Sequence, residues 1–436
     1  MTDFNDMTAP EKRVWWAEEF IKRLEELTKT DEKEVRIVIY YRNREKNKAR
    51  GEYIILTENL KDVLNYMSHL KMNGLAKPLT LGMEANYLIY FASKTMKPFK
   101  DVKKEDIEEY LIGKADKSEA YKLTIKRVLK SFFRWIYEYA KEDGYPEVVK
   151  WIQCKKLKNK ALPKIFTMDE IKSMIDVCDN LRDRAIISTL YDSGCRKGEL
   201  LGVRIGDLVF ETDYCIMNIS DGKTGGRPIT LTSSVPDLKA WINIHPKKND
   251  NNATLFCSMA KNTKGCPMGC TSLDCILKVL AKRVGIEKRV FPHMFRHTRA
   301  THLASYLTEH EMKLNFGWSE SSNMTSVYVH MSGRDVSNKI LQISGLKPRE
   351  NMTISKIPTV ECWNCHETNS IGNKFCRTCH TPLNEKGIKE KEIAERFLKL
   401  MLPIVVEKIE NREMDVGDLK ELIRVTTKHN VPEETQ

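Results

Sequence analysis

A basic segment in the first half of the chain most constrains how the chain can fold. Residues 154–164 read Cys-Lys-Lys-Leu-Lys-Asn-Lys-Ala-Leu-Pro-Lys and show no apolar periodicity. Such a stretch contributes little to a hydrophobic core, so the residues before it and after it are expected to fold as separate units. Thr167 and Glu170 have the spacing of a capping box that opens a helix. We therefore place a basic linker at 153–164 and a domain boundary at its end.

The residues before the linker are predicted to be mostly helical. Residues 56–152 have helical apolar spacing, which is clearest over 118–140, where apolar residues recur every three or four positions. That helix also carries a basic face, which is either a solvated surface or a contact for nucleic-acid phosphates. Residues 1–55 are predicted to be an extension, with an amphipathic helix over 11–29 and a strand or short buried segment over 35–41.

The residues after the linker combine helices with a small sheet. Within residues 165–345, an apolar helix is expected over 181–191, and two β-like runs at 215–219 and 228–231 flank a turn-rich segment that suits a hairpin. Further helices are expected over 271–283, 295–306 and 309–316. The fold class predicted for the whole chain is mainly α with a small β-sheet (α+β).

The charge balance favours a polyanionic partner. Lys and Arg number 72 against 60 Asp and Glu, which gives a net charge of +12 and a pI near 9.0. No long uncharged apolar run predicts a membrane span, and the first residues lack the basic-then-apolar form of a signal peptide. We therefore expect a cytoplasmic protein with no membrane association, whose 12 cysteines are free thiols or metal ligands rather than disulfides.

Two Cys-x-x-Cys pairs near the C-terminus predict a metal site. Cys362 and Cys365 are followed, after ten residues, by Cys376 and Cys379, a spacing that suits one tetrahedral structural zinc in a short ribbon at 358–384. Zinc binding in such peptides typically contributes ~10–16 kcal/mol, which is enough to fold a segment this small. The sequence therefore predicts one structural zinc.

Other residues are weaker candidates for metal ligands. His366 and His380 each follow one pair and compete as ligands, although the four cysteines are favoured. A looser group has irregular spacing, so its members are either a second metal site or, more simply, free thiols: Cys257, Cys266, Cys270 and Cys275.

The end of the chain, residues 387–430, is predicted to be a helical tail. Its apolar residues form one stripe over 389–410, including Phe397 and Leu400, with Pro403 as a kink. Such a stripe more often docks on a core or on a second copy than carries chemistry.

The stretch 291–332 concentrates residues that suit phosphoryl transfer to a tyrosine. His293 and Arg296 lie three residues apart and face one site if the segment is helical. Paired arginines can stabilise the charge that develops on the non-bridging oxygens of a phosphodiester. One well-placed hydrogen-bond donor typically stabilises such a transition state by roughly 3–4 kcal/mol. A histidine can take the tyrosine's proton or hold the oxyanion, and a lysine on a hairpin can protonate the leaving 5′-hydroxyl. Each of these residues, taken alone, has an ordinary structural explanation.

Taken together and in order, the motifs resemble those of the tyrosine recombinase (phage integrase) family. They are Gly194–Leu200, Gly222–Gly225, Pro292–Leu303, Phe316–Trp318 and Tyr328–Ser332. The resemblance covers residues 60 to 345 and is nearest to the integrases of archaeal mobile elements, which often add a Cys-x-x-Cys tail. It implies a helical, SAM-like core-binding domain at 56–152 and a catalytic domain at 165–345.

The resemblance also implies a role for each site residue. Arg196 and Arg296 would clamp the scissile phosphate, and Lys223 would be the general acid. His293 would assist proton transfer, Trp318 would fill the second His/Trp position, and Tyr328 would be the nucleophile. Glu199 and His297 would support them.

Three choices within this pattern need a reason. Trp318 stands where many members have histidine, so it implies hydrogen bonding or packing instead of proton transfer. Arg227 is the alternative to Lys223 on the hairpin, but arginine is a poor proton donor because its pKa is above 12. Tyr328 is preferred to Tyr306, which follows Arg296 too closely.

The function implied is a site-specific DNA recombinase, or integrase, that works through a 3′-phosphotyrosine intermediate. Double-stranded DNA is the implied partner, and a homotetramer on paired sites is the implied assembly. No nucleotide and no catalytic metal are expected, because the phosphotyrosine retains the energy of the broken bond. Two alternatives stay open, namely a type IB topoisomerase-like relaxing enzyme and a non-catalytic DNA-binding regulator on the same scaffold.

Overall fold

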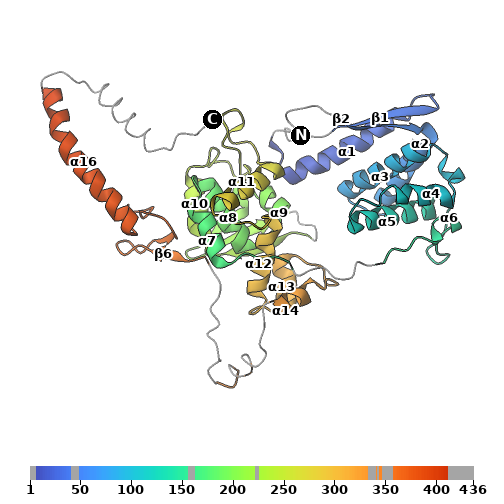
Figure 1. Ribbon diagram of the computed structural model, residues 1–436. Helices are drawn as coiled ribbons and strands as arrows, with labels where there is room; N and C mark the ends of the chain where they lie inside the picture. The colour runs from blue at the N-terminus through green and yellow to red at the C-terminus, as the bar shows by residue number, and fades with distance from the viewer. Residues whose placement is uncertain are drawn as a thin grey trace.

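The computed structural model describes residues 6–40, 49–155, 163–220, 225–331, 340, 343–345 and 357–410. Figure 1 shows two main units, followed by a small ribbon and a long helix. Lys223, most of the linker and residues 411–430 of the expected tail lie outside the described residues. Among the described helices, none is both long enough and apolar enough to span a bilayer.

The N-terminal unit is helical with one β-hairpin. Helix α5 has the buried apolar face predicted for it, including Ile125, Leu129 and Phe132, but it ends at Ile136 rather than at Ala140. Ser118 caps its first turn by accepting from the backbone N–H of Tyr121. The elements are α1 (Ala9–Leu27), β1 (Glu34–Tyr40), β2 (Ala49–Leu56), α2 (Thr57–Met72), α3 (Pro78–Thr95), α4 (Lys104–Ile112), α5 (Glu119–Ile136) and the single turn α6 (Glu147–Lys150).

Described residues of the stretch expected to be an extension, 1–55, contribute to the core of this unit. Leu24 of α1 is buried with Val35 of β1 and Ile55 of β2 in the same hydrophobic cluster as helices α2 to α5. The two strands are antiparallel, with Val35 opposite Ile55. The helix and the strand predicted in this region are both present. Helix α1 packs against α3, and β1 pairs with β2, which also packs against α3.

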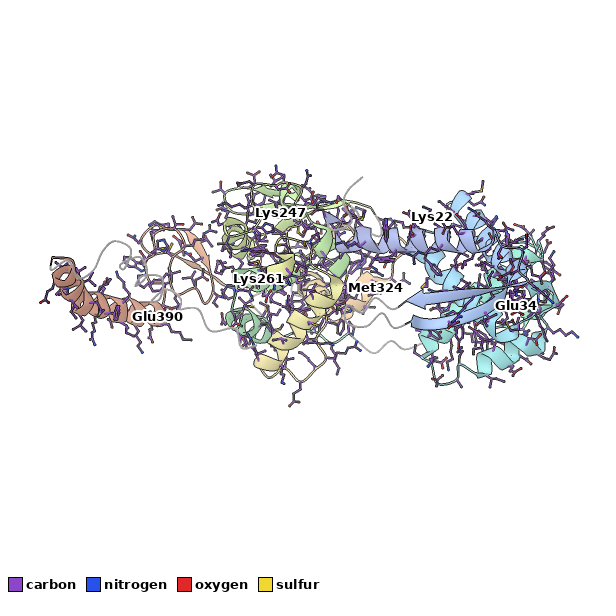
Figure 2. The ribbon with its side chains drawn as sticks, turned by 90° about the horizontal axis from the view of Figure 1, so that it is seen from above. Lys22, Glu34, Lys247, Lys261, Met324 and Glu390 are labelled. Atoms are coloured by element: carbon purple, nitrogen blue, oxygen red, sulfur yellow. The ribbon has the colours of Figure 1, made fainter. Side chains whose placement is uncertain are left out.

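Helix α1 also joins the N-terminal unit to the second one. Figure 2 shows it, marked by Lys22, running between the β-hairpin at Glu34 and the unit that contains Lys247. Its first turn lies on the second unit, where Ala9 is buried in the core and Glu11 pairs with Arg204 at 2.8 Å.

The second unit places helices around a three-stranded antiparallel sheet of order β3-β4-β5. The predicted capping box is confirmed, because Thr167 and Glu170 bond each other's backbone at the start of α7. The predicted hairpin strands are present as β4 and β5, and the short strand β3 is added to them. The elements are α7 (Met168–Asp176), α8 (Leu181–Ser193), α9 (Lys197–Gly202), β3 (Leu208–Phe210), β4 (Cys215–Ile219), β5 (Arg227–Leu231), α10 (Val235–Asn243), α11 (Cys270–Arg283), α12 (Pro292–Leu303), α13 (Glu309–Phe316) and α14 (Met324–Met331).

Helix α8 is the central element of this unit. Its residues from Arg184 to Ser193 are all buried, and α7, α10 and α12 pack against it. Near its end, the carboxylate of Asp192 accepts from the backbone N–H groups of Thr232 and Ser234 at 2.8 and 3.0 Å, which fixes the start of α10. Gly194, with φ at +56°, ends the helix and turns the chain toward Arg196.

The C-terminal part consists of a two-stranded ribbon and helix α16. The ribbon strands are β6 (Thr359–Glu361) and β7 (Thr368–Ser370), and α16 spans Glu385–Glu410. The helix predicted over 389–410 is therefore present, and Pro403 lies inside it. Its apolar stripe is exposed among the described residues, with Phe397 at 51% and Leu400 at 71%. Figure 1 shows α16 leading away from the second unit.

Candidate active site and metal centre

Helix α12 places the central candidate residues on one face. It begins at Pro292, a residue favoured in the first turn, and not at 295 as predicted, so His293 lies within the helix. His293, Arg296 and His297 are spaced by three and four residues and therefore share that face. Arg296 is 1% exposed, whereas His293 opens onto a pocket.

Three arginines converge on the end of α13. The carbonyls of Asn315, Phe316 and Gly317 are among the last of that helix, which its own backbone leaves without partners. The Asn315 carbonyl accepts from Arg227 Nε at 2.9 Å, the Phe316 carbonyl accepts from Arg296 Nη2, and the Gly317 carbonyl accepts from Arg196 Nη2 at 2.9 Å. The negative end of the helix dipole favours these cations.

Two glycines make this approach possible. A Cβ on Gly317 would meet the guanidinium of Arg227 at 2.7 Å, and one on Gly194 would meet the Phe316 ring at 2.6 Å. Both residues have a positive φ, of +57° and +56°, which L side chains rarely adopt. Positions 194 and 317 therefore require glycine.

Glu199 balances the charge of this cluster. Its carboxylate accepts from Arg196 Nη1 at 2.6 Å and from Arg227 Nη2 at 2.9 Å. Burial alone would raise the pKa of Glu199, but the bonds and charge of Arg227, with further bonds from Arg196, outweigh it and lower that pKa to about 2. Glu199 therefore stays ionised and orients both arginines.

Two of the three histidines of α12, His293 and His297, are kept neutral. Surrounding protein desolvates the ring of His293, and the neighbouring His297 and Arg296 add to the effect, so its pKa falls to about 4. Burial, together with Arg296, also lowers the pKa of His297. The two rings meet edge to face with centroids 4.7 Å apart. A neutral imidazole can accept a proton at neutral pH, whereas a protonated one cannot.

Tyr328 lies against Trp318 and His297. Its ring is 1% exposed and stacks on Trp318 with centroids 5.4 Å apart and planes 2° apart. Its hydroxyl is 2.5 Å from His297 Nδ1. Burial raises the pKa of Tyr328 to about 12, although Arg296 acts in the opposite direction. The ring is thus fully buried, and its hydroxyl contacts His297.

A pocket of about 1080 Å³ opens in front of Arg196 and His293 between the two units. Residues of α1, α3, α9 and α11 line it. Two acidic side chains lie on its wall, Glu199 and Asp274, against six cationic ones: Arg13, Lys77, Arg196, Lys197, Lys278 and Arg289. The pocket therefore suits an anionic ligand.

The structure brings together five of the six expected catalytic residues, namely Arg196, His293, Arg296, Trp318 and Tyr328. The sixth, Lys223, lies outside the described residues. The sequence offered Arg227 only as a substitute for Lys223, and it missed the bonds from Arg227 to Glu199 and to α13. The only signal in the sequence for this role was that Arg227 follows two glycines, because Glu199 and Asn315, which accept its hydrogen bonds, are far away in the sequence.

The four ribbon cysteines converge on one point. Their sulfur atoms all lie within 4.8 Å of one another, and the pairs Cys362–Cys379 and Cys365–Cys376 are 3.5 Å apart. Four sulfurs around a zinc ion, with bonds of about 2.3 Å, would lie roughly 3.8 Å apart, so the arrangement fits a tetrahedral metal. The sulfur of Cys376 also accepts from the backbone N–H of Thr378 at 3.5 Å, as a thiolate would.

The other candidate metal ligands do not join a cluster. Among the described residues, the group of four cysteines is the one set of three or more His, Cys, Asp or Glu side chains close enough to share an ion. His366 instead pairs with Glu361 at 2.8 Å, and His380 is exposed. In the looser group, Cys257 is buried in the core and Cys275 is exposed on α11.

The charge network predicts a stability that depends on Glu199. We expect Glu199→Gln to lower the free energy of unfolding at pH 7, because a fall in pKa from 4.5 to about 2 corresponds to roughly 3 kcal/mol. Because its pKa is lowered, the ionised Glu199 carboxylate stabilises the fold above pH 4.5, and this stabilisation is lost as the pH falls toward 2. The difference between variant and wild type should therefore shrink below pH 4.5, as measured by urea unfolding across pH.

The exposed Glu211, changed to Gln, is the matched control for this measurement and should behave as wild type. A Glu199→Gln protein of unchanged stability at pH 7 would contradict the network.

Comparisons with known proteins agree with this geometry. The family model described as the phage integrase family matches residues 164–334. Tyrosine recombinase XerA of Pyrococcus horikoshii is 30% identical over 249 residues, which cover 56% of this chain and 79% of that protein. Tyrosine recombinase XerC of Pelotomaculum thermopropionicum is 26% identical over 294 residues, 62% of this chain and 93% of that protein. A crystal structure of XerH site-specific recombinase bound to difH aligns at 19% identity with a TM-score of 0.48, covering 78% of this chain and 96% of that one. The chain belongs to the phage integrase family of tyrosine recombinases.

Proposed function

We propose that this chain is a site-specific DNA recombinase that cuts and rejoins strands through a 3′-phosphotyrosine intermediate. One observation carries the proposal, namely that the Tyr328 hydroxyl contacts His297, whose ring packs on His293 in the lining of the cationic pocket. Arg196 and Arg296 donate to adjacent carbonyls at the end of α13, so their guanidinium groups lie close together. Arg296 is 1% exposed, so it must be uncovered before it meets a phosphate. The named relatives, XerA and XerC, are tyrosine recombinases.

In the cleavage step, the Tyr328 hydroxyl oxygen bonds to phosphorus while the bond from phosphorus to the 5′-oxygen breaks. The two arginines stabilise the extra charge on the non-bridging oxygens. The leaving 5′-oxygen takes a proton from Lys223, in the role that the family resemblance gives it. Because Tyr328 is buried, α14 must shift before the hydroxyl meets a phosphate.

The proton of Tyr328 goes to His297 in this proposal. His297 contacts the tyrosine hydroxyl and is neutral, so Nδ1 can accept that proton. His293, the residue expected to act there, faces the pocket and is placed to bond the phosphate.

The cationic pocket between the two units supports a DNA partner. Its six cations and the chain's net charge of +12 favour phosphate contacts. The XerH structure holds a difH DNA substrate, and a related structure shows a lambda integrase tetramer on a Holliday junction. We propose double-stranded DNA as the partner of this chain and a homotetramer on paired sites as its working assembly.

The four-cysteine cluster is proposed to hold one structural zinc. A tetrahedral set of thiolates suits this ion, and the ribbon has little apolar core of its own, so the metal would supply most of its folding free energy.

The nucleophile is tested with a suicide duplex. We expect the wild type to form a covalent protein–DNA adduct on a duplex nicked just beyond the cut, drawn from a library of the DNA that flanks the gene. Tyr328→Phe should abolish the adduct because it removes the attacking oxygen, while Tyr306→Phe should retain it. The adduct is measured by denaturing gel electrophoresis.

The same assay separates the alternatives. Tight binding without any adduct would favour the DNA-binding regulator. An adduct that relaxes supercoiled DNA but exchanges no strands between two sites would favour the topoisomerase-like enzyme.

The proton acceptor is tested by the pH dependence of adduct formation. We expect His297→Ala to slow the reaction by roughly 100-fold at pH 7, a typical effect of losing a general base. The wild-type rate should level off above pH 6.5, since the pKa of His297 lies below that value, whereas the variant's rate should keep rising toward the pKa of Tyr328.

The exposed His310 of α13, changed to Ala, is the control and should leave the rate unchanged. A faster His297→Ala enzyme would show that His297 only restrains Tyr328. An unchanged pH profile would show that another group accepts the proton of Tyr328.

The metal is tested by elemental analysis of the purified chain. We expect one zinc per chain, lost in Cys376→Ser because three thiolates bind zinc less tightly than four. Cys275→Ser, which changes an exposed thiol on α11, should keep the zinc. Two zinc ions per chain would instead assign a metal to the looser cysteine group.

A further inference from the structure

The ribbon lies on the second unit through a buried ion pair. Asp237 of α10 and Arg184 of α8 are 3% and 8% exposed, and Arg184 Nε donates to Asp237 Oδ1 at 2.8 Å. Ser370 of β7 donates to that same oxygen at 2.5 Å. Arg184 Nη2 donates in turn to the carbonyl of Ile371. The ribbon thus bonds both members of the Arg184–Asp237 pair, which joins α8 to α10.

Apolar and backbone contacts extend this interface. Ile357, where the described chain enters the ribbon, is 1% exposed and belongs to the hydrophobic core of the second unit. Ile371 packs on the same core, and Arg377 Nη1 donates to the carbonyl of Pro236 at 3.4 Å. Gly372 lies so close to Asp176 of α7 that a Cβ would collide with its carboxylate. Figure 1 shows the ribbon beside α7.

The interface lies on the element that leads to the active site. Arg184 is in the first turn of α8, and the same helix ends at Gly194, two residues before Arg196. Asp192 fixes the other point at which α8 meets α10. Two polar contacts therefore hold these helices together, one within the unit and one beneath the ribbon.

The ribbon's own fold depends on the cysteines. Each of its two strands has three residues, and two of its buried side chains are metal-site thiols, Cys362 and Cys376. A segment this small does not fold on apolar burial alone. Loss of the metal would therefore remove the partners that Ser370 and Ile371 give to the buried ion pair, and a buried pair is costly when its bonds are incomplete.

We propose that the four-cysteine ribbon is a metal-dependent brace of its own catalytic unit. With metal bound it docks on α8 and α10 through Ser370 and Ile371, and without metal it unfolds and releases them. Its docked face is occupied by this chain, so that face does not contact DNA. The proposal rests on the proposed metal site, and it makes the rigidity of the helix behind Arg196 depend on metal content.

Hydrogen exchange on the full chain tests the brace. Zinc-loaded protein is compared with protein treated with excess chelator, following peptides from α8 and α10 and, as an internal reference, from α5. We expect chelation to speed exchange in α8 and α10 by about tenfold or more, because local opening becomes easier, and to leave α5 unchanged.

Variants separate docking from metal binding. Ser370→Leu removes the donor to Asp237 and adds bulk at the interface, and Asp176→Trp adds bulk from the side of α7 without touching the ribbon sequence. Both should keep one zinc but exchange in α8 and α10 like the chelated wild type. Thr368→Leu, at an exposed position of the same strand, should behave as wild type.

The outcomes are distinct for the two proposals. If the wild type binds no zinc, the metal site is wrong and the brace is wrong with it. If zinc binds, but neither chelation nor the two docking variants change exchange in α8 and α10, the metal site stands and the brace is overturned.

Discussion

Three consecutive carbonyl groups at the end of α13 hold three arginines that come from distant parts of the chain. Arg196 follows α8, Arg227 opens β5 and Arg296 lies on α12, yet all donate to residues 315–317. Helix ends leave such carbonyls without partners, so they are ready acceptors. Glu199 completes the arrangement by neutralising part of the charge from the side. The close approach of the helix end is in turn what requires glycine at 194 and 317.

Helix α8 connects this arrangement to the rest of the second unit. At its end, Asp192 holds the start of α10, and Gly194 places Arg196 beside α13. At its beginning, Arg184 meets both α10 and the ribbon. Helix α8 thus contributes to the core, leads to Arg196 and contacts the C-terminal ribbon. The proposed brace therefore acts on the helix that leads to Arg196.

The order of the candidate residues along the chain identified most of the side chains that the structure brings together. The spacing of His293 and Arg296 indicated one helix face, and α12 provides it. The contact between His297 and Tyr328 was not predictable, since it depends on how α14 packs against α12. The part played by Arg227 was hidden for a similar reason. Its acceptors, Glu199 and Asn315, lie far away in sequence, and no local pattern links them.

The sequence by itself determined the local elements, because capping residues, apolar spacing and turn residues act over a few positions. Thr167 starting α7, the apolar face of α5 and the four clustered cysteines belong to this class. Only the tertiary structure decided which surfaces meet. It added Leu24, Val35 and Ile55 to the N-terminal core, buried Tyr328 against Trp318 and placed the ribbon on α8 and α10. Those contacts depend on how well side chains from distant parts of the chain fit together. A local sequence pattern names the side chains but does not show which of them fit together.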